Sequence, residues 1–357
     1  MYLFWIFKFC ALFFIWFLNF DFVFWYLDFI SMMNFWQQFN SPVFSLAPME
    51  DVTDTVFREI VMGMSAPEKL NVVFTEFTSV EGMNHPVGRN RVSERLIVNN
   101  SEKELLRKMN VKLVAQIWGR NPEIYKNIAR YLTESYQFDG IDINMGCPVK
   151  KVVKQGACSA LIGEPSLAKE IIAATKEGTN LPVSVKTRTG IKKHQTEDWI
   201  EQLLESKPAA IILHGRTQKM QSEGDADWLE IAKAVRVRND IDPSVPLHGN
   251  GDVFSYADGL KKIEETGVNG VMVGRGIFKN PWFFNPEKQE ITEKERIAKL
   301  LEHTHLYKQT WGGKKNFNIL KRFYKIYLNS FEGAAKMRAD IMEAKTFSDV
   351  YSYFTSR

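Results

Sequence analysis

Cysteine is scarce in this sequence, and its scarcity excludes two kinds of site. The only cysteines among the 357 residues are Cys10, Cys147 and Cys158. Their number and spacing fit neither a disulfide framework nor a metal-ligand set, and this sparse use is typical of a reducing compartment. We therefore expect a cytoplasmic protein without a metal site.

A large charge excess is also missing, and so is the glycine pattern of dinucleotide-binding folds. The formal net charge is +4 and 25% of the residues are charged, which indicates a globular protein. A mild positive charge does not by itself establish a nucleic-acid partner. No G-x-G-x-x-G sequence follows a predicted strand, so a Rossmann-type site is not indicated.

Residues 1–36 form an aromatic-rich extension that differs from the rest of the chain. Its apolar stretch, Tyr2 to Leu18, contains Lys8 and is slightly shorter than the roughly 20 residues that span a bilayer. It also lacks the small-residue cleavage site of a secretory signal. We expect a mis-called start ahead of Met33. A membrane anchor or interfacial segment and a packed extension are the alternatives, and membrane contact is expected only if the segment belongs to the native protein.

From Pro42 onward, short β-rich runs alternate with helical stretches. Eight runs predict strands: Val43–Ala47, Val72–Phe77, Lys112–Ile117, Gly140–Asn144, Pro182–Thr187, Ala210–Leu213, Pro246–His248 and Gly270–Val273. Several runs are continuously apolar, as in parallel strands that helices cover. This alternation indicates βαβ units. The sequence therefore predicts an α/β fold, a (β/α)8 TIM barrel over residues 42–284.

The strand pattern stops after Asn285, and residues 286–357 read as helices only. An apolar face at helical spacing comprises Phe317, Leu320, Tyr324, Tyr327 and Phe331, and basic residues off that face are Lys321, Arg322 and Lys325. We expect a C-terminal all-helical domain.

Polar or glycine-containing clusters follow almost every predicted strand. They are Pro48-Met49-Glu50, Gln116, Asn144 to Pro148, Lys186 to Arg188, His214 to Thr217, Asn250 to Asp252 and Gly274 to Gly276. In TIM barrels the carboxyl ends of the strands carry the chemistry. The shared register of these clusters therefore indicates an enzyme.

The last two clusters, Gly249 to Asp252 and Gly274 to Gly276, follow the seventh and eighth strands. Barrels commonly bind phosphate there through backbone amides, and Arg275 could add a charge-assisted contact. Two ordinary glycine turns are the alternative.

Lys186 and Arg188 end the fifth strand and point to the same side of it. A lysine that faces a barrel interior needs an anionic or strongly polar partner, and a reduced flavin would be one. A structural ion pair is the alternative. His214 is either part of the same site or a core histidine.

Cys147 lies between Gly146 and Pro148, which impose a non-helical turn just past the fourth strand. A thiol there could donate a proton over the barrel mouth. The alternative is a buried inert cysteine, which is what we expect of Cys158.

These motifs together resemble the tRNA-dihydrouridine synthase family. The similarity is carried by Ala47-Pro48-Met49, Asn144-Met145-Gly146-Cys147-Pro148 with Lys150-Lys151-Val152, Val185 to Arg188, His214-Gly215-Arg216-Thr217, Asn250-Gly251-Asp252 and Gly274-Arg275. It covers the barrel from Pro42 to Trp282, and the helical tail fits the family's tRNA-binding domain in length and position.

The resemblance implies an FMN-dependent oxidoreductase that reduces uridine in tRNA to 5,6-dihydrouridine, with NADPH as electron donor. Hydride would pass from the flavin to C6 of the uracil, and Cys147 would protonate C5. The implied substrate contacts are Asn144 and Arg188. The implied flavin contacts are Pro48, Met49, Gln116, Lys186, His214, Asn250, Gly251, Asp252, Gly274 and Arg275, and we place Glu50, at the same strand end as Met49, in this set. Nothing indicates a stable protein partner.

The sequence departs from the family pattern at two places and leaves two other functions open. The loop Gln218–Ser222 lacks the tyrosine that some members carry, and Cys158 stands where the family often has glycine. The main alternative is a dihydroorotate dehydrogenase-like flavin barrel acting on a small pyrimidine, which the helical tail and the Cys-Pro-x-Lys-Lys pattern disfavour. A tRNA-binding protein without activity is disfavoured by the presence of Cys147 and Lys186.

Overall fold

The structure is a computed structural model, and it describes residues 34–40 and 42–356. The expectations for residues 1–33, including the mis-called start and the anchor, lie outside these residues. Within the described ranges, no helix combines the length and the apolar character needed to cross a bilayer. The chain divides into two compact units, Met1–Asn40 and Ser41–Arg357. In the first unit, Asn34 caps a short 3-10 helix, η1 (Phe35–Gln37).

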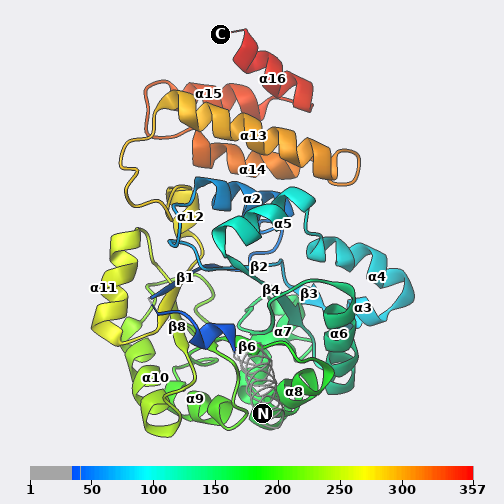
Figure 1. Cartoon of the computed structure of the whole chain (residues 1–357), viewed down its shortest axis with the longest axis vertical. Helices are drawn as coiled ribbons and strands as arrows, with labels where there is room; N and C mark the ends of the chain where they lie inside the picture. Colours follow the sequence, from blue (N-terminus) through cyan, green and yellow to red (C-terminus); the bar gives the residue numbers. More distant parts are fainter. Residues whose placement is uncertain (1–33, 41, 357) are drawn as a thin grey trace, which may run out of the picture. The chain divides into compact units, whose positions relative to one another are not determined.

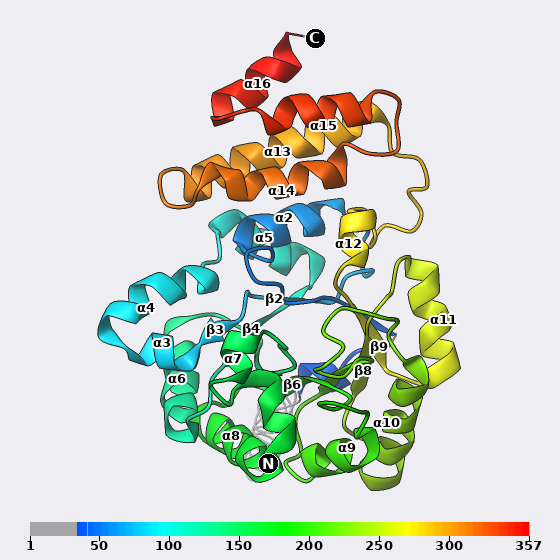
Figure 2. The same cartoon turned by 180° about the vertical axis from the view of Figure 1, so that it is seen from behind.

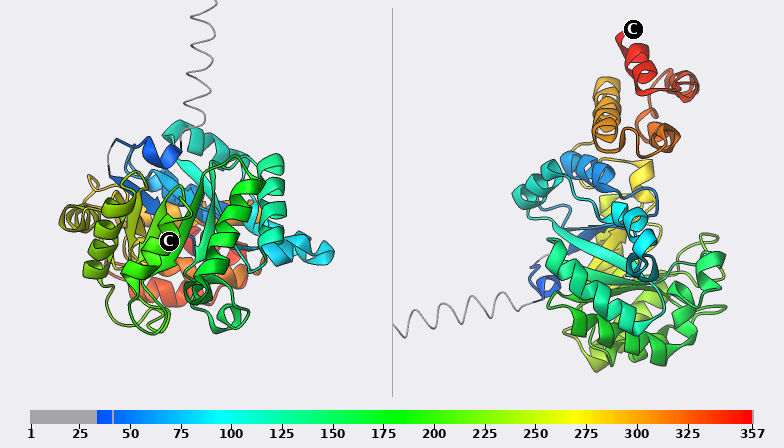
Figure 3. Two further views of the ribbon diagram at one scale, coloured as in Figure 1. Left: turned by 90° about the horizontal axis from the view of Figure 1, so that it is seen from below. Right: turned by 90° about the vertical axis from the view of Figure 1, so that its right-hand side faces the viewer.

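The second unit contains the predicted barrel. Its strands are β1 (Val43–Leu46), β2 (Val72–Phe74), β4 (Lys112–Trp118), β5 (Gly140–Met145), β6 (Val183–Arg188), β7 (Ile211–His214), β8 (Leu247–Asn250) and β9 (Gly270–Val273). All neighbours are parallel, and pairing of β1 with both β2 and β9, together with β2–β4, closes the ring. A two-residue strand, β3 (Thr78–Ser79), pairs with the end of β4. The TIM barrel predicted from the alternation is thus confirmed (Figure 3).

Helices surround the strands and cover their outer face. The main ones are α2 (Thr55–Met64), α5 (Asn100–Met109), α6 (Pro122–Ser135), α8 (Pro165–Gly178), α9 (Thr196–Leu204), α10 (Trp228–Ile241) and α11 (Tyr256–Thr266). Polar N-caps set where they begin: the side chains of Asn121 and Asp227 accept first-turn amides of α6 and α10. α11 ends at Gly267, whose φ of 74° is the left-handed conformation that favours glycine.

Shorter helices lie in the loops between the strands and the main helices. They are α3 (Val80–Asn84), α4 (Pro86–Val92), η2 (Ser93–Leu96), α7 (Lys150–Val153), η3 (Cys158–Gly163) and α12 (Gly276–Lys279). Of these, α7 and η3 follow β5 and complete the loop that carries Cys147.

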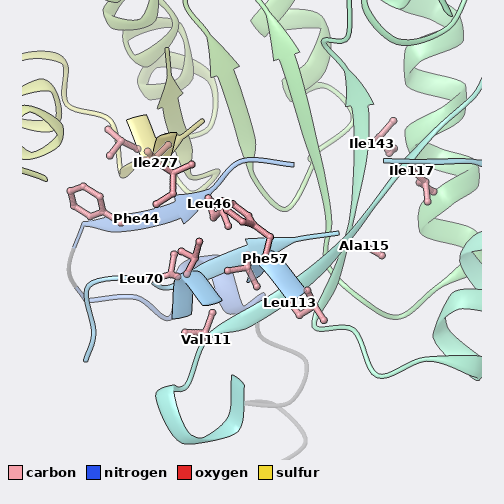
Figure 4. Packing of buried hydrophobic residues seen from close by; sticks show 14 of the residues in the cluster. Phe44, Leu46, Phe57, Leu70, Val111, Leu113, Ala115, Ile117, Ile143 and Ile277 are labelled. Atoms are coloured by element: carbon pink, nitrogen blue, oxygen red, sulfur yellow. The ribbon is translucent and has the colours of Figure 1, made fainter. Parts of the chain in front are cut away.

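The hydrophobic core fills the space between the strands and the covering helices. Phe44 and Leu46 of β1, Leu113 of β4 and Phe57 of α2 are all buried in this core (Figure 4). Burial of each such side chain contributes about 1.5–3 kcal/mol. Because these apolar side chains point outward, the polar ones at the strand ends face the barrel mouth.

The tail consists of α13 (Glu293–Trp311), α14 (Phe317–Tyr327), α15 (Ala334–Met342) and α16 (Phe347–Thr355). α13 and α14 lie over α2, α5 and α12 (Figures 1 and 2). The Phe323 ring of α14 stands 5.1 Å from that of Phe57 in α2, between centroids. On the predicted apolar face, Leu320, Tyr324 and Tyr327 are buried, whereas Phe317 and Phe331 are partly exposed.

Polar contacts also join the tail to the barrel. Lys315 Nζ lies 3.2 Å from Asp54 Oδ2 and 3.8 Å from Glu76 Oε2. Arg322 donates a 3.2 Å hydrogen bond to the carbonyl oxygen of Asp51. We call Asp51, Asp54, Glu76, Lys315 and Arg322 the tail joint. It lies at the ends of β1 and β2, so the tail contacts the same side of the barrel as the strand-end clusters.

Candidate active site

A cavity of about 280 Å³ opens at the carboxyl ends of the strands. It is lined by Pro48, Met49, Gln116, Asn144, Cys147, Lys186, Arg188, His214, Asn250, Gly251, Asp252, Gly274 and Arg275, among others. Every predicted site residue except Glu50 is in this lining. Residues from seven strand ends therefore meet in one place, although they span more than half of the sequence.

Glu50 is the predicted residue that the structure does not bring to the cavity. Its carboxylate forms an ion pair with Arg95. Glu50 follows Met49 directly, but the chain turns there: Thr53 Oγ1 accepts the amide of Met49, and Asp51 has a φ of 55°. This turn directs Glu50 toward Arg95.

A buried network lies beneath the cavity. Asp142 of β5 accepts hydrogen bonds of 2.7 Å from Gln116 Nε2 and of 2.7 Å from Ser184 Oγ. Gln116 Oε1 in turn accepts one of 3.0 Å from Asn144 Nδ2. Burial raises the pKa of Asp142 to about 6, although both hydrogen bonds oppose that rise. The network fixes the orientation of the Gln116 and Asn144 amides.

Asn144 in turn positions the loop that carries Cys147. Its Oδ1 accepts the backbone amides of Gly146 and Cys147, each at 3.0 Å. From the other side, Ser159 Oγ donates to the carbonyl oxygen of Cys147 at 2.7 Å. The turn around Cys147 is therefore held at both its amide and its carbonyl.

Burial and several neighbouring groups affect the thiol itself. A hydrogen bond from Cys158 is the largest cause that lowers the pKa of Cys147, to about 7, and burial opposes it. The amide of Val149 and the charge of Arg188 act in the same direction as Cys158. The thiol is therefore near half-protonation at neutral pH, which suits a group that must donate a proton and recover it.

Lys186 supplies a buried positive group to the same cavity. Its Nζ donates a 3.0 Å hydrogen bond to Asn250 Oδ1. Burial, followed by repulsion from Arg188, lowers the pKa of Lys186 to about 8. A negatively charged ligand would relieve both effects, because it would stabilise the ammonium form.

Arg188, two residues further along β6, holds two loops together. Nε donates to the carbonyl oxygen of Gly146 at 2.7 Å, and Nη1 to those of Thr217 at 3.0 Å and Gln221 at 2.7 Å. These contacts use Nε and Nη1, so Nη2 is the part of the guanidinium that a ligand could engage. The loop lacking an aromatic residue, Gln218–Ser222, is thereby fixed at the edge of the cavity, which Gln221 and Ser222 line.

A charged cluster lies at the ends of β7, β8 and β9. Arg216 lies 2.5 Å from Asp252 Oδ2 and Arg275 2.6 Å from Asp252 Oδ1. Arg216 Nη1 also lies 3.2 Å from Nε2 of His214. Burial, together with the charges of Lys186 and the neighbouring arginines, lowers the pKa of His214 well below its ordinary range. His214 is therefore neutral, with Nε2 as the acceptor toward Arg216.

The two glycine segments bring backbone close to this cluster. Gly251 has a φ of 124°, and a Cβ there would lie 2.6 Å from Ala226 and 2.9 Å from the His214 ring. A Cβ on Gly276 would lie 2.2 Å from the carbonyl oxygen of Val253. Only glycine fits at both positions, so the close backbone packing of these two turns requires glycine, unlike an ordinary surface turn.

Several lining or supporting residues were not among the predicted site residues. Arg216 stands inside the His-Gly-Arg-Thr motif but had been given no role, and Phe77 follows β2 into the cavity. Asp142 could have been found from the alternation of β5, because it shares a face with Asn144. Ser184 carries no sequence signal, since a serine in a buried strand is common.

Comparison with known proteins identifies relatives of this chain. The model of a family described as Dihydrouridine synthase (Dus) matches residues 45–352. "Probable tRNA-dihydrouridine synthase" of Staphylococcus aureus (strain COL) is 41% identical over 318 residues, covering 88% of this chain and 93% of that protein. "Probable tRNA-dihydrouridine synthase 2" of Bacillus subtilis (strain 168) is 40% identical over 319 residues, with 89% and 94% covered.

A solved structure shares the fold. The 6-hydroxypseudooxynicotine amine oxidase of Pseudomonas geniculata N1 aligns with a TM-score of 0.50 and 11% identity over 68% of this chain and 46% of that chain. At this identity the likeness concerns the barrel architecture alone.

Proposed function

Because the chain is an oxidoreductase that belongs to the dihydrouridine synthase family, we propose that it reduces uridine in tRNA to 5,6-dihydrouridine in the cytoplasm, with FMN as bound cofactor and NADPH as donor. The observation that carries the proposal is the cavity that brings Cys147, Lys186 and the two glycine segments together. In this proposal residues 42–284 are the catalytic domain, and residues 286–357 bind tRNA.

The residues of the cavity fit the cofactor. Backbone amides near Gly251 and Gly274, with Arg275, would hold the phosphate, where the glycines let the ligand approach the backbone. Lys186, held by Asn250, would face the electron-rich edge of the flavin ring. Pro48, Met49, Gln116 and His214 would complete the contacts. When bound, FMN supplies the hydride that adds to C6 of the uracil.

Cys147 would then complete the reduction. Its thiol lies on the turn held by Asn144 and Ser159, and it would donate its proton to C5. Nη2 of Arg188 would stabilise negative charge on the uracil carbonyl side. The Asn144 side chain already bonds to Gln116 and to the loop amides. It would therefore assist substrate binding by holding the loop and through the part of its amide that lines the cavity.

The substrate uridine must leave the folded RNA to reach this cavity, since ring chemistry needs the base outside its stack. Lys150, Lys151 and Lys154 are exposed around α7, next to Cys147. They would contact phosphates beside the target nucleotide.

The test is to purify the protein, record its visible spectrum and assay tRNA that lacks dihydrouridine with NADPH or NADH. We expect a yellow protein with bound FMN and dihydrouridine formation. Activity on a free pyrimidine without any on tRNA would replace this proposal by the dihydroorotate dehydrogenase-like alternative. A colourless protein that binds tRNA without reducing it would indicate a binding protein.

A further inference from the structure

Two thiols lie together at the edge of the cavity. Cys147 is partly exposed and lines it, whereas Cys158, at the start of η3, is only 1% exposed. Ser159, which follows Cys158, bonds to the Cys147 carbonyl oxygen, and each of the two thiols shifts the pKa of the other. The proposed reduction uses the proton of Cys147 alone, so it leaves the second thiol without a role.

The backbone brings Cys158 to this position at a cost. Its φ is 54°, in the left-handed region that favours glycine. A residue other than glycine in such a conformation is strained and persists only where its surroundings hold it. Here Ser159 holds it, because its amide and hydroxyl both bond to the Cys147 carbonyl oxygen, at 3.4 and 2.7 Å. These two bonds hold the segment that begins at Cys158 against the turn that carries Cys147.

We propose that peroxide oxidises Cys147 and Cys158 to a reversible disulfide, and that this disulfide switches the enzyme off. The disulfide depends only on the two thiols. The loss of activity rests on the proposed function, since it requires Cys147 to be the proton donor.

The oxidation balances with hydrogen peroxide as the two-electron oxidant. The Cys147 thiolate attacks one peroxide oxygen; the S–O bond forms, the O–O bond breaks, and the departing hydroxide takes a proton to become water. The Cys158 sulfur then attacks the Cys147 sulfur, the S–S bond forms and the S–O bond breaks. The Cys158 proton leaves with the hydroxyl as a second water. A dithiol reductant reverses the process by thiol–disulfide exchange.

The order of attack follows from exposure and charge. Peroxide can reach Cys147 through the cavity, whereas Cys158 is covered. The interaction with Cys158 and, to a smaller extent, the charge of Arg188 lower the pKa of Cys147, while burial raises that of Cys158 well above its ordinary range. Cys147 is therefore the attacking thiol and Cys158 the resolving one.

The test uses the full chain with Cys10→Ser, so that Cys147 and Cys158 are the only thiols. The protein is exposed to peroxide, blocked with an alkylating agent and cleaved with trypsin without reduction. Lys150, Lys151 and Lys154 lie between the two cysteines, so cleavage places them on separate peptides. We expect one linked peptide pair, a protein lighter by two hydrogen atoms, and loss of tRNA reduction that dithiothreitol restores.

Cys158→Gly is the matched control, because glycine accepts the left-handed backbone. In it peroxide should convert Cys147 to higher oxides that dithiothreitol does not reverse. Recovery of Cys147 as a sulfinic acid in the parent protein, with Cys158 still alkylated and no linked pair, would overturn the proposal. A linked pair with full activity would keep the disulfide but refute the role of Cys147 as donor, which separates the two failures.

Discussion

Cys147 takes its chemical character from three neighbours that the chain brings to it from two directions. Asn144 fixes its amide, Ser159 its carbonyl, and Cys158 its thiol. We expect Cys147→Ala to keep bound FMN, since the phosphate segments are untouched, and to lose roughly 10²–10⁴-fold in tRNA reduction, the usual contribution of a general acid. Flavin absorbance measures the retained FMN, and the dihydrouridine content of the tRNA measures the lost reduction. Wild-type turnover would exclude Cys147 as the donor.

The protonation of Cys147 is a separate expectation at the same scale. With a pKa of about 7, Cys147 carries its proton mainly below that pH. Its alkylation rate should therefore rise with pH through a midpoint near 7, while the ability to donate a proton falls over the same range. Cys158→Gly removes the largest cause of the lowered pKa, so the midpoint should move upward. The pH dependence of alkylation, with Cys147→Ala as the blank, checks both; an unmoved midpoint would contradict the assignment.

At the scale of elements, the tail joint has an unusual electrostatic balance where Lys315, just before α14, meets the ends of β1 and β2. Glu76 is buried beside Asp54, and burial raises its pKa from 4.5 to about 7 despite the attraction of Lys315. The folded protein therefore keeps a proton that the unfolded chain releases between these two values. The contribution of this protonated carboxyl to the free energy of unfolding is complete below pH 4.5 and is lost as pH rises through about 7.

Glu76→Gln should remove that dependence. The amide oxygen can still accept the backbone amide of Asp51, which bonds Glu76 Oε1 at 2.6 Å. The variant should gain stability at pH 8, by at most about 3 kcal/mol, and little at low pH. Urea unfolding at several pH values measures this. Lys315→Ala is the opposite control, because it removes the cation that lies between Asp54 and Glu76. A gain of stability there would contradict the proposed balance.

At the scale of the whole molecule, RNA binding requires a cationic surface wider than the cavity. Of the basic residues predicted on α14, Lys321 donates to the Met342 carbonyl oxygen at 2.7 Å and Arg322 belongs to the tail joint. Lys325 is exposed. Replacing all three would therefore disturb the tail as well as any phosphate contact, whereas the exposed lysines around α7 test RNA binding more cleanly.

The combined variant Lys150→Ala, Lys151→Ala and Lys154→Ala should weaken tRNA binding and reduce its salt slope by about one unit per lost contact. Flavin content should not change. Filter binding over a salt series measures the slope, and Lys325→Ala tested in the same way measures the tail's share. Equal affinity and slope for wild type and the α7 variant would place the RNA elsewhere.

The sequence by itself determined the architecture and most of the residues at the barrel mouth. Continuous apolar runs alternating with helical patterns were enough, because a strand covered on both faces must be apolar throughout. The observed bounds of β9 match the predicted run, and those of β1, β4 and β5 differ by one residue at one end. The strand-end clusters followed from the same register, since parallel strands present their carboxyl ends on one side.

Only the tertiary structure decided how these residues are partnered. Glu50 turns to Arg95, Arg216 joins His214 to Asp252, and Cys158 meets Cys147. None of these contacts follows from periodicity, which places a side chain on a face of its own element but not opposite a particular partner on another. The distances between elements are set by barrel closure and by loop conformation, and it is these distances that fix hydrogen bonds, ion pairs and pKa values.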